Sequence, residues 1–92
     1  AKEVAPHGIT VNCVLPGFTR TEEMERIWGS IAAAAGTTID ELVDPILKDK
    51  VPVNRWLQPE EIGHMVAFLA SRKADAITGH LHYVDGGIDA HD

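Results

Sequence analysis

The chain has 92 residues, of which 45% are hydrophobic and 24% charged, and its formal net charge is −6 at pH 7. This composition is typical of a globular protein, and the length allows one small domain with a small core. The negative charge disfavours nucleic acid and anionic membranes as partners, and no apolar run approaches the roughly 20 residues that span a bilayer. The single cysteine, Cys13, cannot form an internal disulfide, so we expect a reducing, cytoplasmic location.

The first residues have the composition of a helix that ends almost at once. Residues 1–5 are good helix formers, but Pro6-His7-Gly8 follows them directly. An isolated helix that short does not form in water. We therefore expect residues 1–8 to be the end of a helix, and an upstream part of the natural protein to be missing from this chain.

Residues 9–15 are mostly β-branched or apolar and run directly into Pro16-Gly17. Apolar residues on both alternating faces are typical of a parallel strand covered on two sides, so we expect a buried strand, with Cys13 as a small buried side chain. Ligands of open α/β sheets bind beyond the carboxyl ends of such strands, and hydroxyl side chains follow at Thr19 and Thr21. The pattern indicates a ligand loop, and an ordinary turn after a strand explains it equally well.

A first helix is expected over residues 22–36. Met24, Ile27, Trp28 and Ile31 recur on one helical face. Such a stripe is more often a packing surface than a recognition surface.

A second helix is expected to begin at Thr38, because Thr38-Ile39-Asp40-Glu41 is a capping box in which the Thr38 side chain accepts from the Glu41 N–H and Glu41 reaches back. Pro45 leaves two alternatives, a kinked helix or a new helix that opens at Asp44. Residues 51–56 predict an extended connector, since the residue before Pro52 is driven out of the helical region.

The clearest helix has Gln58 at its cap and Pro59 as its first residue. Residues 79–84 then predict a second strand, which ends at a turn begun by Asp85. Arg55 is expected to make a structural ion pair or to donate to a carbonyl. The apolar positions of the helix, which should face a sheet, are Ile62, Met65, Val66, Leu69 and Ala70.

Four blocks of sequence are distinctive when they are taken in order. They are Ala-Pro-His-Gly, then Ile-Thr-Val-Asn-Cys-Val-Leu-Pro-Gly-Phe-Thr-Arg-Thr, then Gln-Pro-Glu-Glu-Ile with Val-Ala-Phe-Leu-Ala-Ser, then Ile-Thr-Gly-His-Leu-His-Tyr-Val-Asp-Gly-Gly. In this order they resemble the carboxyl-terminal third of the short-chain dehydrogenase/reductase family. The resemblance implies a Rossmann-type α/β fold with a doubly wound parallel sheet, of which this chain supplies the last two strands, the substrate-lid helices and the final helix.

The same resemblance divides residues 1–92, as part of a single Rossmann-type domain, into four segments. They are a helix end (1–8), a strand with the nicotinamide loop (9–21), a substrate lid (22–54), and the final helix and strand (55–92).

In that family the Pro-Gly loop closes over the nicotinamide end of NAD or NADP. By position, the resemblance implies that Pro16, Gly17 and Phe18 shape the wall of the nicotinamide pocket. It also implies that the Thr19 backbone N–H and C=O bind the carboxamide, and that the Thr21 hydroxyl donates to the carboxamide or to the pyrophosphate. Many relatives have an aliphatic residue at the position of Thr19, which leaves a backbone role intact.

The resemblance further implies that the lid contacts a small-molecule carbonyl or alcohol substrate through Met24, Ile27 and Trp28. The parent enzyme would transfer a hydride between the nicotinamide and that substrate. Whether it uses NAD or NADP stays open, because the residue that selects the ribose lies in the missing amino-terminal part.

No catalytic residue can be named in this chain. The family's Tyr-x-x-x-Lys pair is absent, since the only tyrosine, Tyr83, has Gly87 four residues after it, and the glycines nowhere form G-x-x-x-G-x-G. Nor do we name a metal site, because His80 and His82 lack a third ligand at a suitable spacing and are better explained as surface or interface residues. We expect the isolated chain to be inactive.

Two further expectations concern assembly. The strand at 9–15 would expose an unpaired apolar edge without its neighbours, so we expect a homo-oligomer or aggregate. The alternative to an enzyme segment is a non-catalytic binding or assembly module derived from the same fold.

Overall fold

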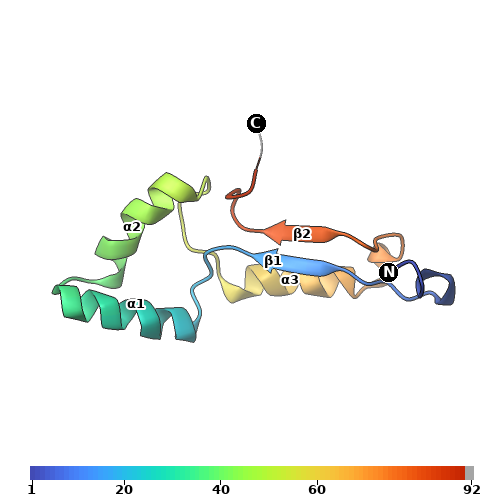
Figure 1. The fold of residues 1–92 in the computed structure, drawn as a ribbon, viewed down its shortest axis with the longest axis horizontal. Helices are drawn as coiled ribbons and strands as arrows, with labels where there is room; N and C mark the ends of the chain where they lie inside the picture. The colour runs from blue at the N-terminus through green and yellow to red at the C-terminus, as the bar shows by residue number, and fades with distance from the viewer. Residues whose placement is uncertain (91–92) are drawn as a thin grey trace.

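The computed structural model describes residues 1–90 and shows an α/β arrangement of one two-stranded parallel sheet and three α-helices. Residues 91 and 92, at the end of the expected segment 55–92, lie outside the described residues. In chain order the elements are the 3-10 helix η1 (Ala5–His7), β1 (Cys13–Pro16), α1 (Glu22–Ala35), α2 (Ile39–Lys50), α3 (Pro59–Leu69), the 3-10 helix η2 (Arg72–Ala74) and β2 (Leu81–Val84) (Figure 1).

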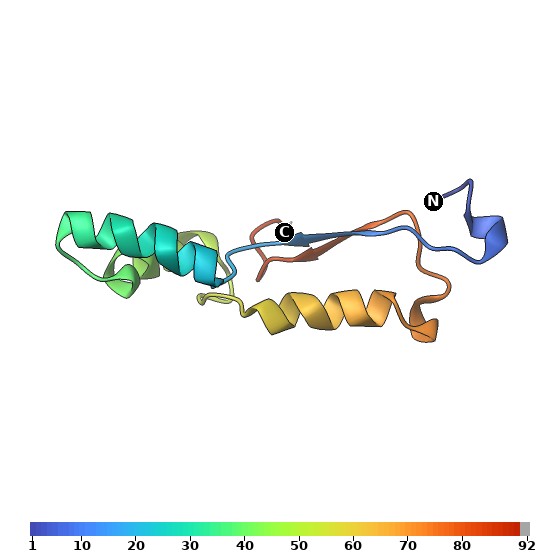
Figure 2. The ribbon, with the colours of Figure 1, turned by 90° about the horizontal axis from the view of Figure 1, so that it is seen from below.

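The two strands pair in parallel, with Cys13 opposite Leu81 and Pro16 opposite Val84. The second strand therefore begins at Leu81, two residues later than the start of the predicted 79–84. Helix α3 runs along one face of this sheet and contacts both strands, and no helix of residues 1–90 lies over the other face (Figure 2). Both strands point toward the same edge, where the chain continues into the loop at residues 16–21.

The prediction of a buried strand over residues 9–15 is wrong in two respects. Regular strand structure begins only at Cys13, although the Gly79 N–H still donates to the Val11 carbonyl at 2.8 Å. The Ile9 and Val11 side chains are 51% and 48% exposed, and Cys13 is exposed rather than buried. An apolar strand is buried only when layers cover both of its faces, and among residues 1–90 only α3 provides a helical layer.

The expected helix end at residues 1–8 is instead a turn followed by η1. Pro6 lies inside this 3-10 helix rather than ending it, because the first turn of a helix does not use the N–H that proline lacks. Gly8 ends η1 with φ of +74°.

The first predicted helix is confirmed as α1. The Thr21 hydroxyl accepts a hydrogen bond from the Met24 N–H at 3.1 Å and so caps the first turn, which the helix cannot satisfy internally. Gly36 ends the helix with φ of +70°. The sequence interpretation placed both ends correctly but did not assign the capping role to Thr21.

The second helix, α2, begins where the capping box predicted. The Thr38 hydroxyl accepts from the Glu41 N–H at 3.2 Å, whereas the Glu41 carboxylate accepts from the Thr37 hydroxyl instead of reaching back to Thr38. One helix runs through Pro45, so α2 does not restart at Asp44. Proline has no N–H, so α2 passes Pro45 with one intrahelical hydrogen bond fewer.

Helix α3 starts with Pro59 as predicted, and the Gln58 N–H donates to the Glu61 carboxylate at 2.9 Å. The predicted apolar face is wider than the face that the sheet covers. Ile62, Met65 and Leu69 are half-buried, but Val66 and Ala70 are exposed, and Val66 shows 51% of its surface.

The main buried cluster is formed by α2 and the connector that follows it, and not by residues beneath the sheet. Val43, Leu47, Val51 and Trp56 form a buried cluster, in which Val43 is fully buried. Met24 and Trp28 of the predicted α1 stripe therefore pack against α2 and Trp56, whereas Ile27 and Ile31 are exposed. The half-buried residues that pack against the cluster are Phe18, Met24, Trp28, Ile39 and Leu42.

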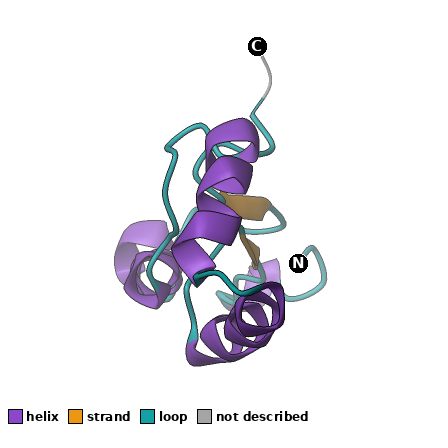
Figure 3. Ribbon diagram, turned by 90° about the vertical axis from the view of Figure 1, so that its left-hand side faces the viewer, coloured by secondary structure: helices purple, strands orange, loops and turns teal. Residues whose placement is uncertain are grey.

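The chain is more extended than a self-contained domain. Its radius of gyration is 17.0 Å and its extents are 56 × 31 × 20 Å, whereas a compact domain of this length has a radius of gyration of about 12 Å. Its accessible surface of 6666 Å² exceeds the about 5,200 Å² of a folded monomer of this size. Figure 3 looks along the long axis from the end where α1 and α2 lie, with the sheet behind them.

None of the helices between residues 1 and 90 is both long enough and apolar enough to cross a membrane.

Candidate functional site

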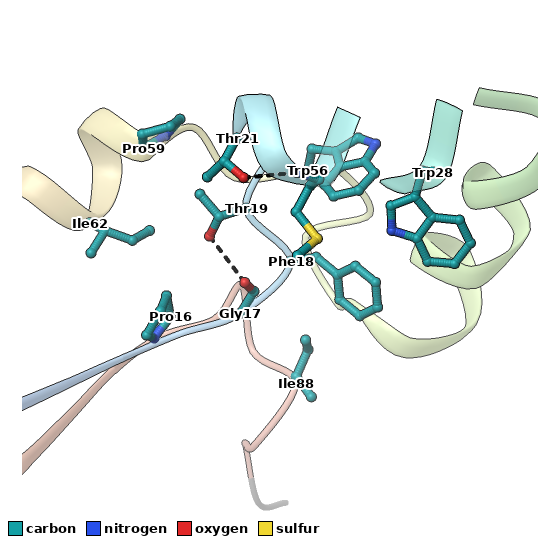
Figure 4. A pocket seen from close by; sticks show the side chains of 11 residues that line it. Pro16, Gly17, Phe18, Thr19, Thr21, Trp28, Trp56, Pro59, Ile62 and Ile88 are labelled. Carbon is teal, nitrogen blue, oxygen red and sulfur yellow. Dashed lines mark hydrogen bonds between the residues drawn. The ribbon is translucent and has the colours of Figure 1, made fainter. Parts of the chain in front are cut away.

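A cavity of about 710 Å³ opens at the carboxyl end of β1. This volume lies within the range of small-molecule sites. The structure brings all five residues predicted for the cofactor into the lining, and two of the three predicted for the substrate (Figure 4). The third, Ile27, is 37% exposed and lies outside the lining. The lining residues are Pro16, Gly17, Phe18, Thr19, Thr21, Met24, Trp28, Trp56, Pro59, Ile62 and Ile88.

Gly17 lines this cavity and lies against the end of β2. Its N–H donates to the Val84 carbonyl at 3.0 Å, and a Cβ built on Gly17 would lie 2.7 Å from the Asp85 Cα. Asp85 is a turn residue as predicted, because its carboxylate accepts from the N–H groups of Gly87 and Asp89 at 2.9 and 3.0 Å. Only glycine allows the loop to come this close to the turn.

The backbone of Thr19 has a defined direction. The Phe18 carbonyl accepts from the Leu57 N–H at 2.7 Å, and the Arg20 N–H donates to the Leu57 carbonyl at 2.9 Å. In a trans peptide the C=O and N–H point in opposite directions. The Thr19 N–H and C=O, which share those two peptides, therefore point away from Leu57. The Thr21 N–H donates to this Thr19 carbonyl at 3.1 Å.

The two threonine hydroxyls have different partners. The Thr19 hydroxyl donates to the Gly17 carbonyl at 3.0 Å and so closes the turn of the loop (Figure 4). The Thr21 hydroxyl is the cap of α1, where it accepts from the Met24 N–H. A hydroxyl that accepts still has its own proton to donate. Thr21 can therefore cap the helix and donate to a ligand at the same time.

Apolar side chains from four parts of the chain form the rest of the lining. Met24 and Trp28 come from α1, Ile62 from α3, Trp56 from the connector and Ile88 from the segment after β2. The Phe18 and Trp56 rings meet edge to face, with centroids 6.0 Å apart and an interplanar angle of 70°. Phe18, Met24 and Trp28 also pack against the buried cluster, so these three residues connect the cavity lining to that core.

The sequence interpretation missed four lining residues. Pro59 and Ile62 carried a signal, because a helix that leads into a parallel strand begins at the carboxyl edge of the sheet. Trp56 carried a weaker one, as a large aromatic residue in the connector at 51–56. The prediction that this connector is extended is wrong, because the Asn54 N–H donates to the Val51 carbonyl at 2.7 Å and closes a turn in which Asn54 has φ of +54°. Ile88 lies in a segment without periodicity and carried none.

Arg55 makes the structural contacts that were predicted for it. Its guanidinium forms a bidentate pair with the Glu61 carboxylate at 2.8 and 3.0 Å, and it donates to the Trp56 carbonyl at 3.1 Å. The Arg55 guanidinium first, and then the Gln58 N–H, lower the pKa of Glu61 to about 2. These contacts fasten the start of α3 to the connector beside the cavity.

Comparison with known proteins agrees with this architecture. The family model described as enoyl-(acyl carrier protein) reductase matches residues 1–89. An uncharacterized oxidoreductase of Bacillus subtilis is 36% identical over 90 residues, which cover 98% of this chain and 35% of that protein. The crystal structure of a short chain dehydrogenase family protein from Francisella tularensis superposes with a TM-score of 0.89 at 36% identity, over 99% of this chain and 37% of that one. The chain belongs to the short-chain dehydrogenase/reductase family.

Two further members of the short-chain dehydrogenase/reductase family carry descriptive names. The 3-oxoacyl-(acyl-carrier-protein) reductase of Rickettsia conorii is 36% identical over 86 residues, 94% of this chain and 31% of that protein. The L-sorbose reductase of Gluconobacter frateurii, solved with NADPH and L-sorbose, has a TM-score of 0.90 at 26% identity, over 99% of this chain and 35% of that one. The Rossmann-type α/β fold predicted from sequence is confirmed. The chain spans about a third of the length of these relatives.

The remaining polar residues that a short-chain dehydrogenase/reductase could use lie elsewhere. Tyr83 is 48% exposed on β2 and outside the cavity lining. The His82 Nε2 lies 3.0 Å from the Asn12 Oδ1, and His80 is exposed. Between residues 1 and 90 no three His, Cys, Asp or Glu side chains are grouped closely enough to hold a metal ion.

Proposed function

We propose that this chain is the segment of an NAD(P)-dependent oxidoreductase that binds the nicotinamide end of the cofactor and forms one wall of the substrate site. The observation that carries the proposal is the Thr19 backbone, whose N–H and C=O point away from Leu57 at a residue that lines the cavity. Support comes from family membership and from relatives described with NADPH.

The loop fits the chemistry of a carboxamide. This group offers one acceptor oxygen and two N–H donors. The Thr19 N–H would donate to that oxygen, and the Thr19 carbonyl would accept from the amide nitrogen. The Thr21 hydroxyl proton, which the helix cap leaves free, donates to the carboxamide or to the pyrophosphate. Pro16 and Phe18 supply apolar lining for the ring.

When bound, the nicotinamide would supply the hydride. The Thr19 backbone and the Thr21 hydroxyl would orient its carboxamide and so decide which face of the ring meets the substrate. Met24 and Trp28 of α1 then provide an apolar wall that excludes water from the hydride path. The substrate class we propose is a carbonyl compound or a secondary alcohol, in keeping with the reductase names of the relatives.

The remaining two-thirds of the parent would complete the site. The extended shape of the chain and the exposed apolar residues Ile9, Val11 and Leu81 indicate that further layers of the same domain cover the sheet. We place the proton donor of the reaction in that part, because Tyr83 lies outside the cavity lining and no Tyr-x-x-x-Lys occurs in these residues. The isolated chain is therefore inactive, and residues 22–54 serve as the substrate lid in the parent.

An activity comparison tests this proposal. The purified full-length parent and the isolated 92-residue chain are each given NADH or NADPH with a panel of ketones, and the oxidised cofactors with secondary alcohols. We expect nicotinamide-dependent turnover from the parent and none from the isolated chain. Turnover by the isolated chain would overturn the assignment of the proton donor. A parent that binds neither cofactor would instead support the non-catalytic binding module.

A further inference from the structure

Arg20 lies between the two threonines of the loop, but its side chain leaves the cavity. Its Nε donates to the Glu25 carboxylate of α1 at 3.1 Å, and its Nη1 donates to the Asp40 carboxylate of α2 at 3.0 Å. Its backbone N–H is already bonded to the Leu57 carbonyl at 2.9 Å. One residue therefore joins the loop, both lid helices and the strand-like segment that precedes α3.

The guanidinium of Arg20 also contacts the Trp56 ring. Its Cζ lies 5.8 Å from the centroid of the Trp56 ring, within the range of a cation–π contact. The Arg20 side chain is 29% exposed, whereas the side chains of Glu25 and Asp40 are 54% and 65% exposed. The hydrogen bond to Asp40, and then that to Glu25, raise the pKa of Arg20 above its usual value. The charge is thus present throughout the physiological range.

The other ion pairs in residues 1–90 do not connect the same parts. Arg26 pairs with Glu23 on its own helix, and Lys50 pairs with its neighbour Asp49. The bidentate pair of Arg55 fastens the connector to α3. Within the described chain, only the Arg20 pairs reach from the cofactor loop to both helices that carry or support the substrate wall.

Exposed ion pairs add little to the free energy of unfolding, because solvent screens them and two long side chains lose freedom. The relative position of two helices can nevertheless depend on such pairs. Arginine presents donors in a fixed planar fork, so contacts with two carboxylates on different helices define one relative position of those helices. A shift of α1 along its neighbours would displace Met24 and Trp28 from the cavity wall.

We propose that Arg20 is a positioning residue. Its guanidinium binds Glu25 of α1 and Asp40 of α2, an arrangement that we call the clasp, and so fixes where Met24 and Trp28 lie in the substrate wall. This inference rests on the proposed function for its kinetic consequence. Because the clasp holds the helices and not the loop's own hydrogen bonds, it acts on substrate KM and not on cofactor Kd.

The kinetic test uses three variants of the full-length parent. Arg20→Gln removes the charge, and Arg20→Lys keeps the charge without the fork. Arg26→Gln is the matched control, because Arg26 lies on α1 and pairs only with Glu23 of its own helix. We expect Arg20→Gln to raise substrate KM about three- to tenfold while cofactor Kd stays within about twofold. Arg20→Lys should fall between Arg20→Gln and wild type, because an ammonium is a point charge that does not reproduce both contacts. Arg26→Gln should match wild type.

The dependence of substrate KM on ionic strength is a second readout, which a purely packing role of Arg20 would not change. The wild-type substrate KM should rise with added salt, because salt screens exposed pairs, and the Arg20→Gln KM should stay flat. Equal salt dependence in both proteins, or equal KM values for Arg20→Gln and Arg26→Gln, would overturn the clasp.

Hydrogen exchange keeps this inference separable from the proposed function, because it needs no turnover. In the full-length parent, Arg20→Gln should speed amide exchange in α1 and α2 but not in β1, and Arg26→Gln should change neither. A parent without turnover in which exchange responds this way would contradict the proposed function alone. An active parent in which Arg20→Gln leaves the exchange of both helices unchanged would contradict the clasp alone.

Discussion

Gly17 lies against Asp85 so closely that a Cβ on residue 17 would be 2.7 Å from the Asp85 Cα and 2.9 Å from its Cβ. This contact joins the loop at 16–21 to the turn after β2. In the parent, Gly17→Ala should lower the free energy of unfolding by about 1–3 kcal/mol, because backbone must move to admit the methyl group. It should also raise cofactor Kd, since the moved loop carries Thr19.

Gly63 provides the matched control for that substitution. It lies in α3, and a Cβ built on it meets nothing within 4 Å. Gly63→Ala should be neutral or stabilising by up to about 1 kcal/mol, because alanine is the better helix former. Denaturant unfolding and cofactor titration measure both effects. A Gly17→Ala protein as stable as Gly63→Ala would show that the close approach has no energetic consequence.

Thr21 is predicted to have two separable roles. Thr21→Ala should cost about 1 kcal/mol of stability from the lost cap and weaken cofactor binding by roughly 0.5–1.5 kcal/mol from one lost hydrogen bond. Thr21→Asp keeps an acceptor for the Met24 N–H but has no proton to donate, so it should retain stability and lose affinity. Thr19→Val should change cofactor Kd much less, because the Thr19 contact is assigned to the backbone.

Melting temperature and cofactor Kd, measured on the same samples of the parent, separate these roles. Thr21→Ser serves as the control that keeps both the cap and the donor. Equal, large losses of affinity in Thr19→Val and Thr21→Ala would give the Thr19 side chain a role that its bond to the Gly17 carbonyl does not explain.

Trp28 is expected to choose among substrates. Trp28→Ala in the parent should change kcat/KM unevenly across ketones of different size and leave cofactor Kd nearly unchanged. It should also lower the melting temperature, because Trp28 packs against the buried cluster. Ile27→Ala, one residue away and outside the lining, tests the remaining predicted substrate contact. A uniform loss for all substrates in Trp28→Ala would make Trp28 a packing residue only.

The Arg55–Glu61 pair predicts a pH dependence. Its surroundings lower the pKa of Glu61 from 4.5 to about 2, so the pair adds stability that is fully present above 4.5 and is lost as pH falls toward 2. The melting temperature of Glu61→Gln should therefore lie below that of wild type at neutral pH. This difference should vanish as the pH approaches about 2. Glu60→Gln is the control, because Glu60 makes no ion pair within residues 1–90. A difference that is constant with pH would rule out the linkage.

The sequence predicts most accurately what neighbouring residues decide. The starts of α2 and α3 follow from Thr38 and from Gln58-Pro59, because caps act over three or four residues. The burial of Ile9 and Cys13 could not be predicted in this way, since it depends on layers that the described chain does not contain. Pro45 also resisted prediction, because the packing of Val43 and Leu47, more than local propensity, holds α2 in one piece.

In the candidate site, too, the features set by neighbouring residues could be predicted and those set by long-range packing could not. The loop at 16–21 could be identified because a strand end, a Pro-Gly turn and a family pattern coincide within a few residues. Trp56 and Ile88 join the lining through long-range packing, which no local pattern encodes. The Arg20 contacts likewise depend on where α2 returns, because Asp40 is distant in sequence.

The most direct measurement follows the threonine amides of the loop during cofactor binding. The parent is labelled with nitrogen isotope on threonine only, and its amide signals are recorded with and without saturating NAD or NADP. We predict that the Thr19 and Thr21 signals shift strongly while those of Thr37 and Thr38, at the far end of the lid, do not. Unshifted Thr19 and Thr21 signals in a parent that demonstrably binds the cofactor would contradict the assignment of this loop to the nicotinamide.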